Sequence, residues 1–433
     1  MPLRLSHHEP DFEPRFAAFL DQKREAEADV DDAVAAIISD VRARGVGAVL
    51  ELTARFDRFE TDAAGLRITD EEIDDAIATV PQGDREALAL AAERIRAYHQ
   101  RQKPEDASWT DGSGAVLGWR WGAVESAGLY VPGGLASYPS SVLMNAIPAR
   151  VAGVGRLAIA APTPDGQANP LVLLAARLSG VDEIWRIGGA QAVAALAYGA
   201  GPIRPVDKIT GPGNAYVAAA KRRVFGHVGI DMIAGPSEIL VIADRDNDPD
   251  WIALDLMSQA EHDESAQSIL VTDDPAFAEA VGEAVEQRLE TLARRAIAGA
   301  SWRDHGALIV ARDLDQAATL ANRVAPEHLE LCVADAEGLA AKIRHAGAIF
   351  LGAHTPEAIG DYVGGPNHVL PTARSARFSS GLSVLDFMKR TTTARMSPGA
   401  LAAIGPAAEA LAKAEGLEAH GLSVRCRLDA MNG

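Results

Sequence analysis

The chain has few cysteines and no excess of positive charge, and each shortage excludes a class of protein. Cys332 and Cys426 are the only cysteines among 433 residues. Two isolated thiols fit neither a disulfide framework nor a zinc knuckle, so we expect both to be buried in strand-like segments of a cytoplasmic protein. The formal net charge of −19 argues against nucleic acid or an anionic membrane as the main partner. A phosphate-bearing ligand would therefore bind backbone N–H groups and helix ends.

Long apolar runs and internal repeats are also lacking. No run reaches 18 apolar residues, so we expect no membrane span, and residues 1–10 lack the apolar core of a signal peptide. Hydrophobic residues make up 48% and charged residues 23% of the chain, as in ordinary globular enzymes. A chain of 433 residues exceeds one ordinary core, which predicts two to four structural units.

The hydrophobic pattern changes along the chain. Residues 12–104 are acidic and have helical spacing, which predicts a helical scaffold. Between about 140 and 245, short strands and helices alternate, and this alternation predicts a parallel sheet covered by helices. Helices and strands continue to about residue 375. The tail from Leu401 predicts a helix followed by a short strand near Val424.

Three glycine-containing turns each follow a predicted strand: Pro132–Gly134, Gly188–Gln191 and Gly211–Asn214. None is a G-x-G-x-x-G fingerprint, and no acidic residue stands at the usual ribose position. Each turn alone is compatible with a simple tight turn. Three at one edge of a parallel sheet favour a ligand site, because ligands bind outside the carboxyl ends of the strands. Gln191 and Asn214 are the polar residues placed to contact that ligand.

The pentapeptide Ser258–His262 ends a predicted helix. Gln259 and His262 are three residues apart, so their side chains lean from one helical face toward one point and could hold a divalent metal. A polar helix end that caps its own carbonyls is the alternative, and glutamine is an unusual zinc ligand. The expected apolar stripe of this helix includes Trp251, Leu254 and Met257.

The eleven histidines divide into two groups. Seven have polar or helix-end surroundings that predict solvated side chains: His7, His8, His99, His227, His305, His345 and His354. Four lie in glycine- and proline-shaped loops or beside acids: His262, His328, His368 and His420. Glu327 and His328 follow a proline, and an imidazole beside a carboxylate could transfer protons near neutral pH. A chance surface pair would have the same sequence.

Two further segments carry candidate ligands. Asp361 and His368 lie in a loop with three glycines and a proline, more than a plain connection requires. Glu415 and His420 lie so late in the chain that surface positions are the usual expectation. If Asp361 and His420 joined Gln259 and His262, the set would suit zinc with an open coordination position. Spacing alone does not show that they converge.

With these segments in view, the chain resembles the histidinol dehydrogenase family almost end to end, most clearly over residues 116–428. Eight motifs in order carry the resemblance: Gly128–Gly134, Gly188–Ala192, Gly211–Ala215, Ala234–Glu238, Ser258–His262, Pro326–Leu329, Gly365–Pro371, and Glu415 with Ala419–His420. The resemblance implies a zinc- and NAD-dependent oxidation of L-histidinol through L-histidinal to L-histidine, the last two steps of histidine biosynthesis, with two NAD. No position departs from the pattern, so nothing suggests an inactive copy.

The resemblance also implies a role for each matching residue. One zinc ion per subunit would be bound by Gln259, His262, Asp361 and His420, and Glu327 and His328 would be catalytic. NAD contacts fall on Tyr130, Gln191 and Asn214. Substrate contacts fall on Ser237, His368, Glu415, His328 and the zinc ligands Gln259, His262, Asp361 and His420. The family forms an intertwined homodimer in which the late histidine completes the partner's zinc site.

The expected fold is α/β, with two Rossmann-like parallel-sheet domains, a helical N-terminal region and a small C-terminal tail domain. We expect residues 1–125 with 236–380 to form a first α/β domain carrying most of the site, 126–235 a nucleotide-binding domain, and 381–433 a tail reaching the partner's site. Two other functions fit parts of the pattern. One is a same-scaffold dehydrogenase of another small polyol such as sulfopropanediol, against which Glu415 argues. The other is a non-catalytic zinc- or nucleotide-binding subunit, against which Glu327 and His328 argue.

Overall fold

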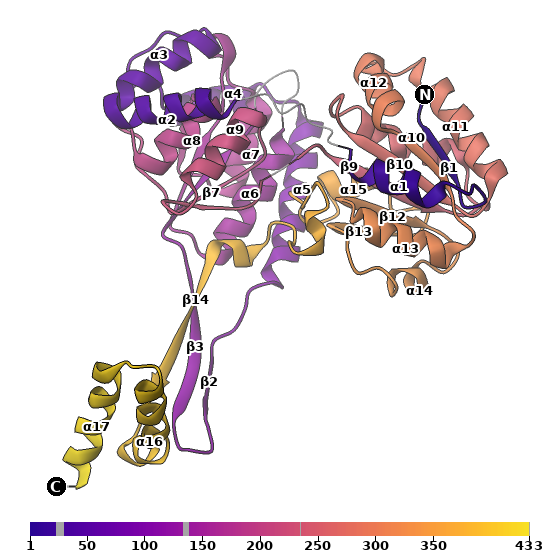
Figure 1. Cartoon of the computed structure of the whole chain (residues 1–433). Helices are drawn as coiled ribbons and strands as arrows, with labels where there is room; N and C mark the ends of the chain where they lie inside the picture. The colour runs from indigo at the N-terminus through magenta and orange to yellow at the C-terminus, as the bar shows by residue number, and fades with distance from the viewer. Residues whose placement is uncertain (23–29, 133–137, 234, 433) are drawn as a thin grey trace.

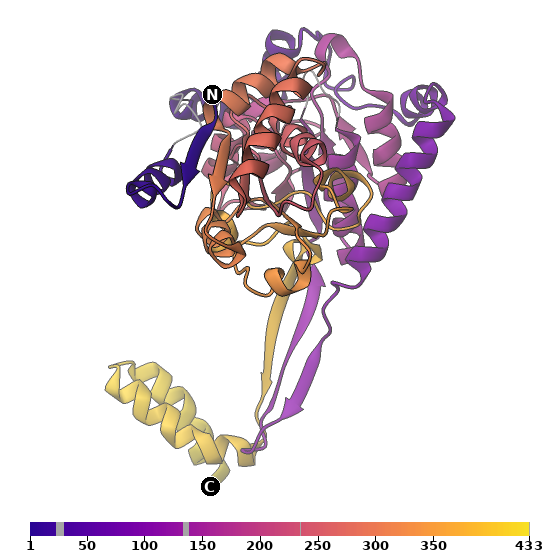
Figure 2. The same ribbon diagram turned by 90° about the vertical axis from the view of Figure 1, so that its right-hand side faces the viewer.

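The computed structural model describes residues 1–22, 30–132, 138–233 and 235–432. They form two α/β lobes and a long arm that projects from them and ends in a pair of helices (Figure 1). The view turned by 90° shows the same separation of the arm from the lobes (Figure 2). No helix of the described residues is both long and apolar enough to cross a membrane.

The first lobe is built on a six-stranded parallel sheet. Its strands, in spatial order, are β1 (Leu3–Ser6), β11 (Ala307–Val310), β10 (Gln267–Thr272), β9 (Glu238–Ala243), β12 (His328–Cys332) and β13 (Ala348–Leu351). The sequence Glu238–Ala243 is buried along its whole length, as expected for a central parallel strand covered on both faces. Apart from the edge strand β1, the strand order follows a doubly wound pattern, and its direction reverses between β9 and β12.

Helices cover both faces of this sheet. One face packs against α1 (Phe12–Leu20), α13 (Leu314–Val324) and α14 (Ala336–Ala340). The other packs against α10 (Pro249–Ala260), α11 (Pro275–Leu289) and α12 (Arg295–His305). The short α15 (Glu357–Tyr362) follows β13 and contacts α10.

The second lobe repeats the same strand order with five parallel strands. They are β6 (Glu183–Trp185), β5 (Arg156–Ala160), β4 (Ser126–Tyr130), β7 (Lys208–Thr210) and β8 (Gly229–Ile230). The reversal falls between β4 and β7. One face is covered by α2 (Asp31–Arg44), α3 (Val46–Asp57), α8 (Gly189–Tyr198) and α9 (Ala215–Val224). The other is covered by α4 (Asp70–Ala78), α5 (Gln82–Gln100), α6 (Pro139–Ala152) and α7 (Pro170–Ser179).

Two parallel-sheet lobes confirm the expected α/β class, but one grouping differs. We expected residues 1–125 to join the first lobe, whereas α2–α5 pack against the second. Val34 and Ile38 of α2 are buried beside α8, and Ile95 of α5 is buried beside α6. Both faces of the second sheet must be covered, and these N-terminal helices extend the cover that α6–α9 provide.

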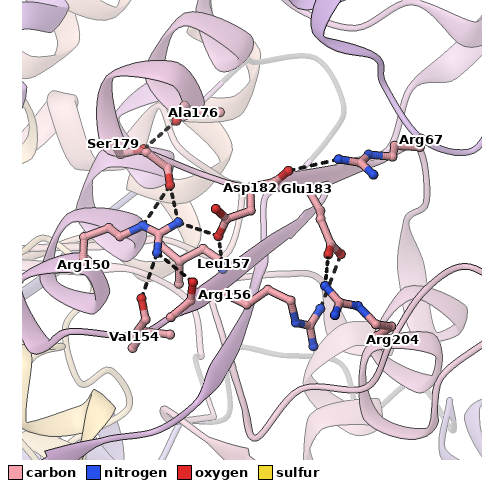
Figure 3. A network of polar contacts seen from close by, with 12 residues as sticks. Arg67, Arg150, Val154, Arg156, Leu157, Ala176, Ser179, Asp182, Glu183 and Arg204 are labelled. Atoms are coloured by element: carbon pink, nitrogen blue, oxygen red, sulfur yellow. Dashed lines mark hydrogen bonds and ion pairs between the residues drawn. The ribbon is translucent and has the colours of Figure 1, made fainter.

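The amino edge of the second sheet is held by a network of arginines and carboxylates (Figure 3). Arg204 donates to Oε1 of Glu183 at 2.6 Å, and Arg156 lies 3.4 Å from the other oxygen of that carboxylate. Asp182 accepts a hydrogen bond from the backbone N–H of Leu157 at 2.8 Å. The network ties the starts of β5 and β6 to each other, at the edge opposite to the glycine turns.

The arm is an antiparallel ribbon that ends in a helical hairpin. Its strands are β2 (Ala107–Thr110), β3 (Val116–Ala123) and β14 (Met388–Arg395). Its helices are α16 (Pro398–Ala414) and α17 (Glu418–Asn432). The short 3-10 helices η1 (Pro164–Gly166), η2 (Ser375–Arg377) and η3 (Val384–Phe387) complete the described elements.

The tail corrects two expectations. The predicted strand near Val424 is wrong, because Val424 and Leu428 lie one helical turn apart in α17 and both face Gly405 of α16. Cys426 was expected to be buried in a strand, yet it is exposed on this helix. Cys332 is buried in β12 as expected.

Two other burial expectations are also wrong. Trp251 and Leu254 are 49% and 41% exposed, and only Met257 of the predicted stripe is buried. The buried face of α10 is instead formed by Ile252, Ala253, Leu256, Met257, Gln259 and Ala260. His99 was expected to be solvated, but it is fully buried, with Nδ1 2.8 Å from the carbonyl oxygen of Ile95.

Replacement of Gly128 by valine is expected to lower the free energy of unfolding by about 1–3 kcal/mol. A Cβ at this position of β4 would lie 3.0 Å from Leu196 Cδ1 and 3.1 Å from Val206 Cγ2, so α8 would have to move. Urea unfolding measures the change. Gly122→Ala in β3 is the control, because its Cβ would meet nothing within 4 Å. Equal stability losses in the two variants would contradict this packing.

Candidate functional site

The candidate residues of the first lobe lie at the amino ends of its strands. Glu327 precedes His328, the first residue of β12, and Ser237 precedes Glu238, the first residue of β9. β9 and β12 are neighbours at the reversal point of the sheet. The expectation of a ligand at carboxyl ends therefore applies to the glycine turns of the second lobe and not to this pair.

Contacts across the lobes join this amino edge to the carboxyl edge of the second sheet. Ser141, in the first turn of α6, has its Oγ 3.4 Å from Nε2 of His368. The side chain of Asn367 donates to the carbonyl oxygen of Met144 in the same helix at 2.6 Å. Because α6 starts at the carboxyl edge of the second sheet, the candidate site lies between the two lobes.

His328 is held as a neutral base. Its Nδ1 lies 3.0 Å from the carbonyl oxygen of Glu238, so Nδ1 carries the proton and donates it to that oxygen. Nε2 is buried and has no hydrogen-bond partner among the described residues. Burial lowers the pKa of His328 to about 4. The ring is therefore unprotonated at neutral pH, with a free acceptor nitrogen.

Glu327 is fixed by the same pair of strands. Its Oε2 accepts a hydrogen bond from the backbone N–H of Glu238 at 2.9 Å. The carboxylate of Glu238 in turn accepts from the backbone N–H of Ala373 at 3.1 Å. Both Glu327 and Glu238 are buried. The carboxylate of Glu327 thus has a defined place beside the imidazole of His328, whose Nδ1 is 3.8 Å away.

Asp361 lies between two imidazoles. Its Oδ1 is 3.9 Å from Nε2 of His328 and 3.8 Å from Nδ1 of His368. Nδ1 of His368 also lies 3.0 Å from the backbone carbonyl oxygen of Asp361, which orients that ring. Burial lowers the pKa of His368, and the nearby Asp361 carboxylate opposes this effect. Asp361, His328 and His368 are therefore brought to one place, as the sequence could not show.

Gln259 and His262 supply further donor atoms at the end of α10. Gln259 is fully buried, and neither atom of its amide group has a hydrogen-bond partner among the described residues. An amide left unpaired in this way costs about 1–3 kcal/mol, which a bound ligand would offset. His262 is exposed, and it lies close enough to contribute to the lowered pKa of both His328 and His368. The ring is therefore near them.

An amide oxygen, an imidazole and a carboxylate from Gln259, His262 and Asp361 fit a zinc ion and leave room for another ligand. A second group of possible ligand atoms, from His328, Glu357 and Asp361, lies within 4.8 Å of one another. We favour the first set. Burial, reinforced by the nearby Asp361 carboxylate, raises the pKa of Glu357 well above its usual range, so loss of its proton costs more than for an ordinary carboxyl group.

Glu415 and His420 are not near the site of their own chain. Both are exposed and belong to the helical hairpin, which lies at the far end of the arm in both views (Figures 1 and 2). One chain thus brings together Glu327, His328, Asp361 and His368 but not the residues of the tail.

The nucleotide candidates gather at the carboxyl edge of the second sheet. Tyr130 ends β4, and its hydroxyl accepts a hydrogen bond from the backbone N–H of Gly189 at 3.1 Å. Gln191 is buried in the first turn of α8. Asn214 caps α9 by accepting from the backbone N–H groups of Tyr216 and Val217. Gly133 and Gly134 of the first predicted turn lie outside the described residues.

Sequence reasoning missed a buried acidic group behind His328. Glu330 lies two residues along β12, so its side chain points to the same face of the sheet as His328. Its Oε1 accepts from the backbone N–H of Glu357 at 2.6 Å, and Asp255 of α10 lies close by. In the sequence, the feature that could have pointed to Glu330 was a single acidic residue inside the apolar strand Leu329–Val333. Asp57, buried at the end of α3, was also missed.

The chain is similar to histidinol dehydrogenases throughout its length. The family model described as histidinol dehydrogenase matches residues 20–428. The histidinol dehydrogenase of Ruegeria pomeroyi is 74% identical over 433 residues, and that of Cereibacter sphaeroides is 75% identical over 432 residues, with 100% of each chain covered. A crystal structure of histidinol dehydrogenase from Elizabethkingia anophelis is 34% identical, with a TM-score of 0.95 over 100% of this chain and 99% of that one.

Asp255→Asn is expected to raise the free energy of unfolding at pH 8 by about 1–3 kcal/mol, and by much less at pH 4. Burial raises the pKa of Asp255 to about 6. Between pH ~3.9 and 6 the folded protein therefore binds more protons than the unfolded chain, and this carboxyl group destabilises the fold as pH rises through that window. Urea unfolding at both pH values measures the effect.

The control for this variant is Asp246→Asn, which removes an exposed carboxylate. We expect its stability difference from the parent to be the same at both pH values. An equal pH response in the two variants would mean that Asp255 titrates like a surface group.

Proposed function

Because the chain belongs to the histidinol dehydrogenase family, we propose that it oxidises L-histidinol through L-histidinal to L-histidine, the last two steps of histidine biosynthesis. Each oxidation removes a hydride from the carbon that bears oxygen and a proton from the hydroxyl group on that carbon, and a water molecule adds to the aldehyde between them. Two NAD accept the hydrides. The observation that carries the proposal is the buried, neutral His328, whose free Nε2 lies at the edge where the two lobes meet.

His328 is the general base for the hydroxyl proton. The bond from Nδ1 to the carbonyl oxygen of Glu238 keeps the acceptor lone pair on Nε2. General base catalysis of this kind contributes about 10² to 10⁴-fold to a rate. In the second oxidation, Glu327 takes a proton from the attacking water. The hydrogen bond that holds its carboxylate to the backbone of Glu238, beside the ring of His328, supports this role.

Gln259, His262, Asp361 and the His420 of a second copy would hold one zinc ion per subunit, which would supply a binding point for the imidazole and amine of the substrate and so orient its carbinol carbon. The unpaired amide of Gln259 and the carboxylate of Asp361 between two imidazoles support this set. Orientation can supply several kcal/mol of a barrier, up to roughly 7–11 in ideal cases. Ser237, His368 and Glu415 are the further substrate contacts.

NAD would bind at the carboxyl edge of the second sheet. Tyr130, Gln191 and Asn214 stand around its reversal point, and the N-terminus of α8 presents backbone N–H groups that suit a phosphate. With the net charge of −19, these local groups rather than a basic surface would hold the dinucleotide. The base His328 belongs to the other lobe, so both oxidations would take place between the lobes.

The site would be completed by an intertwined homodimer. The arm places His420 and Glu415 away from their own lobes, and its hairpin exposes apolar residues: Ile404, Leu411, Leu417 and Leu422. On α15, beside Asp361, Ile359 and Tyr362 are also exposed. Exchange of arms between two copies would cover both surfaces and bring His420 to the ligands of the other chain. A cytoplasmic location stays a prediction.

The direct test is an assay of NAD reduction by the purified protein, combined with metal analysis. We expect about one zinc per chain, and turnover with L-histidinol and L-histidinal but not with sulfopropanediol or other small polyols. Turnover of another polyol in preference to histidinol would replace the proposed substrate. Zinc and NAD binding without turnover of any alcohol would identify a non-catalytic subunit.

Glu327→Gln is expected to slow the oxidation of L-histidinal more than that of L-histidinol, because only the second step needs an activated water. The loss should approach 10² to 10⁴-fold for that step. Single-turnover kinetics with each substrate measure the two steps separately, and bound zinc serves as the control for an intact site. Unaltered rates for both substrates would show that Glu327 has another role.

His328→Asn and His420→Ala are each expected to be nearly inactive alone, but a refolded mixture should regain activity. In a mixed dimer, the lobes of the His420→Ala chain would receive an intact tail from the other chain. Random pairing gives about one quarter of the wild-type number of sites if each site uses one tail from the partner. A mixture that stays inactive would indicate that sites are not shared between chains.

A further inference from the structure

A buried ion pair holds the glycine turn that follows β7. Lys221 of α9 and Asp231, which follows β8, form this pair, with side chains 3% and 1% exposed. Nζ of Lys221 donates to the carbonyl oxygen of Gly211 at 3.0 Å, and Oδ2 of Asp231 accepts from the backbone N–H of Gly211 at 2.8 Å. Both main-chain groups of one glycine are therefore bound by the two partners of a single ion pair.

The contacts to Gly211 matter because this glycine lies between two nucleotide candidates, Tyr130 and Asn214. Gly211 has a φ of +114°, and a Cβ there would overlap the carbonyl oxygen of Tyr130. The end of β7 thus lies directly against the end of β4, at the reversal point of the second sheet. Three residues later, Asn214 caps α9. The direction in which the chain leaves Gly211 therefore sets where Asn214 stands relative to Tyr130.

Stability alone gives little reason to bury this pair. Removing two charges from water costs several kcal/mol per ion, and apolar residues of similar volume often stabilise a fold as well or better. A buried pair can instead fix one conformation among several, since its geometry is demanding. Here Asp231 binds the N–H and Lys221 binds the C=O of the same glycine, so the turn has little freedom to rotate.

We propose that Lys221 and Asp231 are positioning residues for the dinucleotide, which they do not touch. They hold the turn from Gly211 to Asn214 in the conformation that binds NAD. This inference rests on the proposed function, in which NAD binds at the carboxyl edge of the second sheet. It adds that the affinity for NAD depends on a charge pair behind the binding surface.

The test is the double variant Lys221→Met/Asp231→Leu, which replaces the pair by apolar side chains. No unpaired charge is left in the interior, but the N–H and C=O of Gly211 lose their partners, so we expect a moderate fall in Tm. KM for NAD should rise on the order of tenfold, a change of about one decade in affinity. kcat and KM for L-histidinol should stay within about twofold. Calorimetric titration with NAD in the absence of substrate should show the same loss of affinity.

Glu183→Gln is the matched control. Glu183 is also a buried carboxylate paired with arginines in the same lobe, but it lies at the opposite, amino edge of the sheet (Figure 3). We expect it to lower Tm without changing KM for NAD. Asp231→Asn is a second variant, which keeps an oxygen for the N–H of Gly211 but removes the charge. It leaves Lys221 without its charged partner, so its Tm should fall, and its NAD binding should be weakened at temperatures where it remains folded.

An unchanged affinity for NAD in Asp231→Asn and in a folded double variant would overturn the proposal. A parallel loss of affinity for NAD in Glu183→Gln would also overturn it, since the effect would then follow stability. Failure of the proposed function looks different. The parent protein would then not reduce NAD with L-histidinol. The ratio of the Kd values for NAD of variant and parent, measured by calorimetry, would still report on the ion pair.

Discussion

The hydrogen bond between His328 Nδ1 and the carbonyl oxygen of Glu238 is the contact on which the site depends. It joins the first residues of two neighbouring strands, so the register of β9 with β12 sets the tautomer of the ring. The start of β9 also positions Glu327, whose carboxylate accepts a hydrogen bond from the backbone N–H of Glu238. Backbone pairing of β9 with β12 therefore controls the orientation of both the imidazole and the carboxylate beside it.

The two lobes share one strand order but contribute opposite edges to the interface between them. The second lobe presents its carboxyl edge, where glycine turns and helix N-termini suit a dinucleotide. The first lobe presents its amino edge, where the ends of α10 and α15 bring amide, imidazole and carboxylate groups together. In the proposed function this division separates the polar groups that would bind phosphate from those that would transfer protons, and contacts such as Ser141 with His368 connect them.

The sequence predicted the elements better than it predicted their packing. Alternating strands and helices over 140–245 indicated a parallel sheet, and the glycine turns indicated one of its edges. The convergence of Asp361, His328 and His368 was not predictable from spacing, because it depends on where α15 returns after β13. The placement of α2–α5 on the second lobe failed for the same reason, since an amphipathic helix does not encode which sheet it covers. Glu330 was missed because an acid in an apolar strand shows its importance only when its neighbours are known.

The arm has a consequence for a newly made chain. Leu411, Leu417 and Leu422 are 64%, 43% and 54% exposed on the hairpin, and in a lone chain they face water. Exposed apolar groups of this kind promote non-specific association. In the proposed homodimer these groups are covered, so a chain leaving the ribosome would be at greatest risk of aggregation until it meets another copy. At low rates of synthesis this interval would lengthen, and the yield of usable protein would depend on how often nascent copies encounter one another.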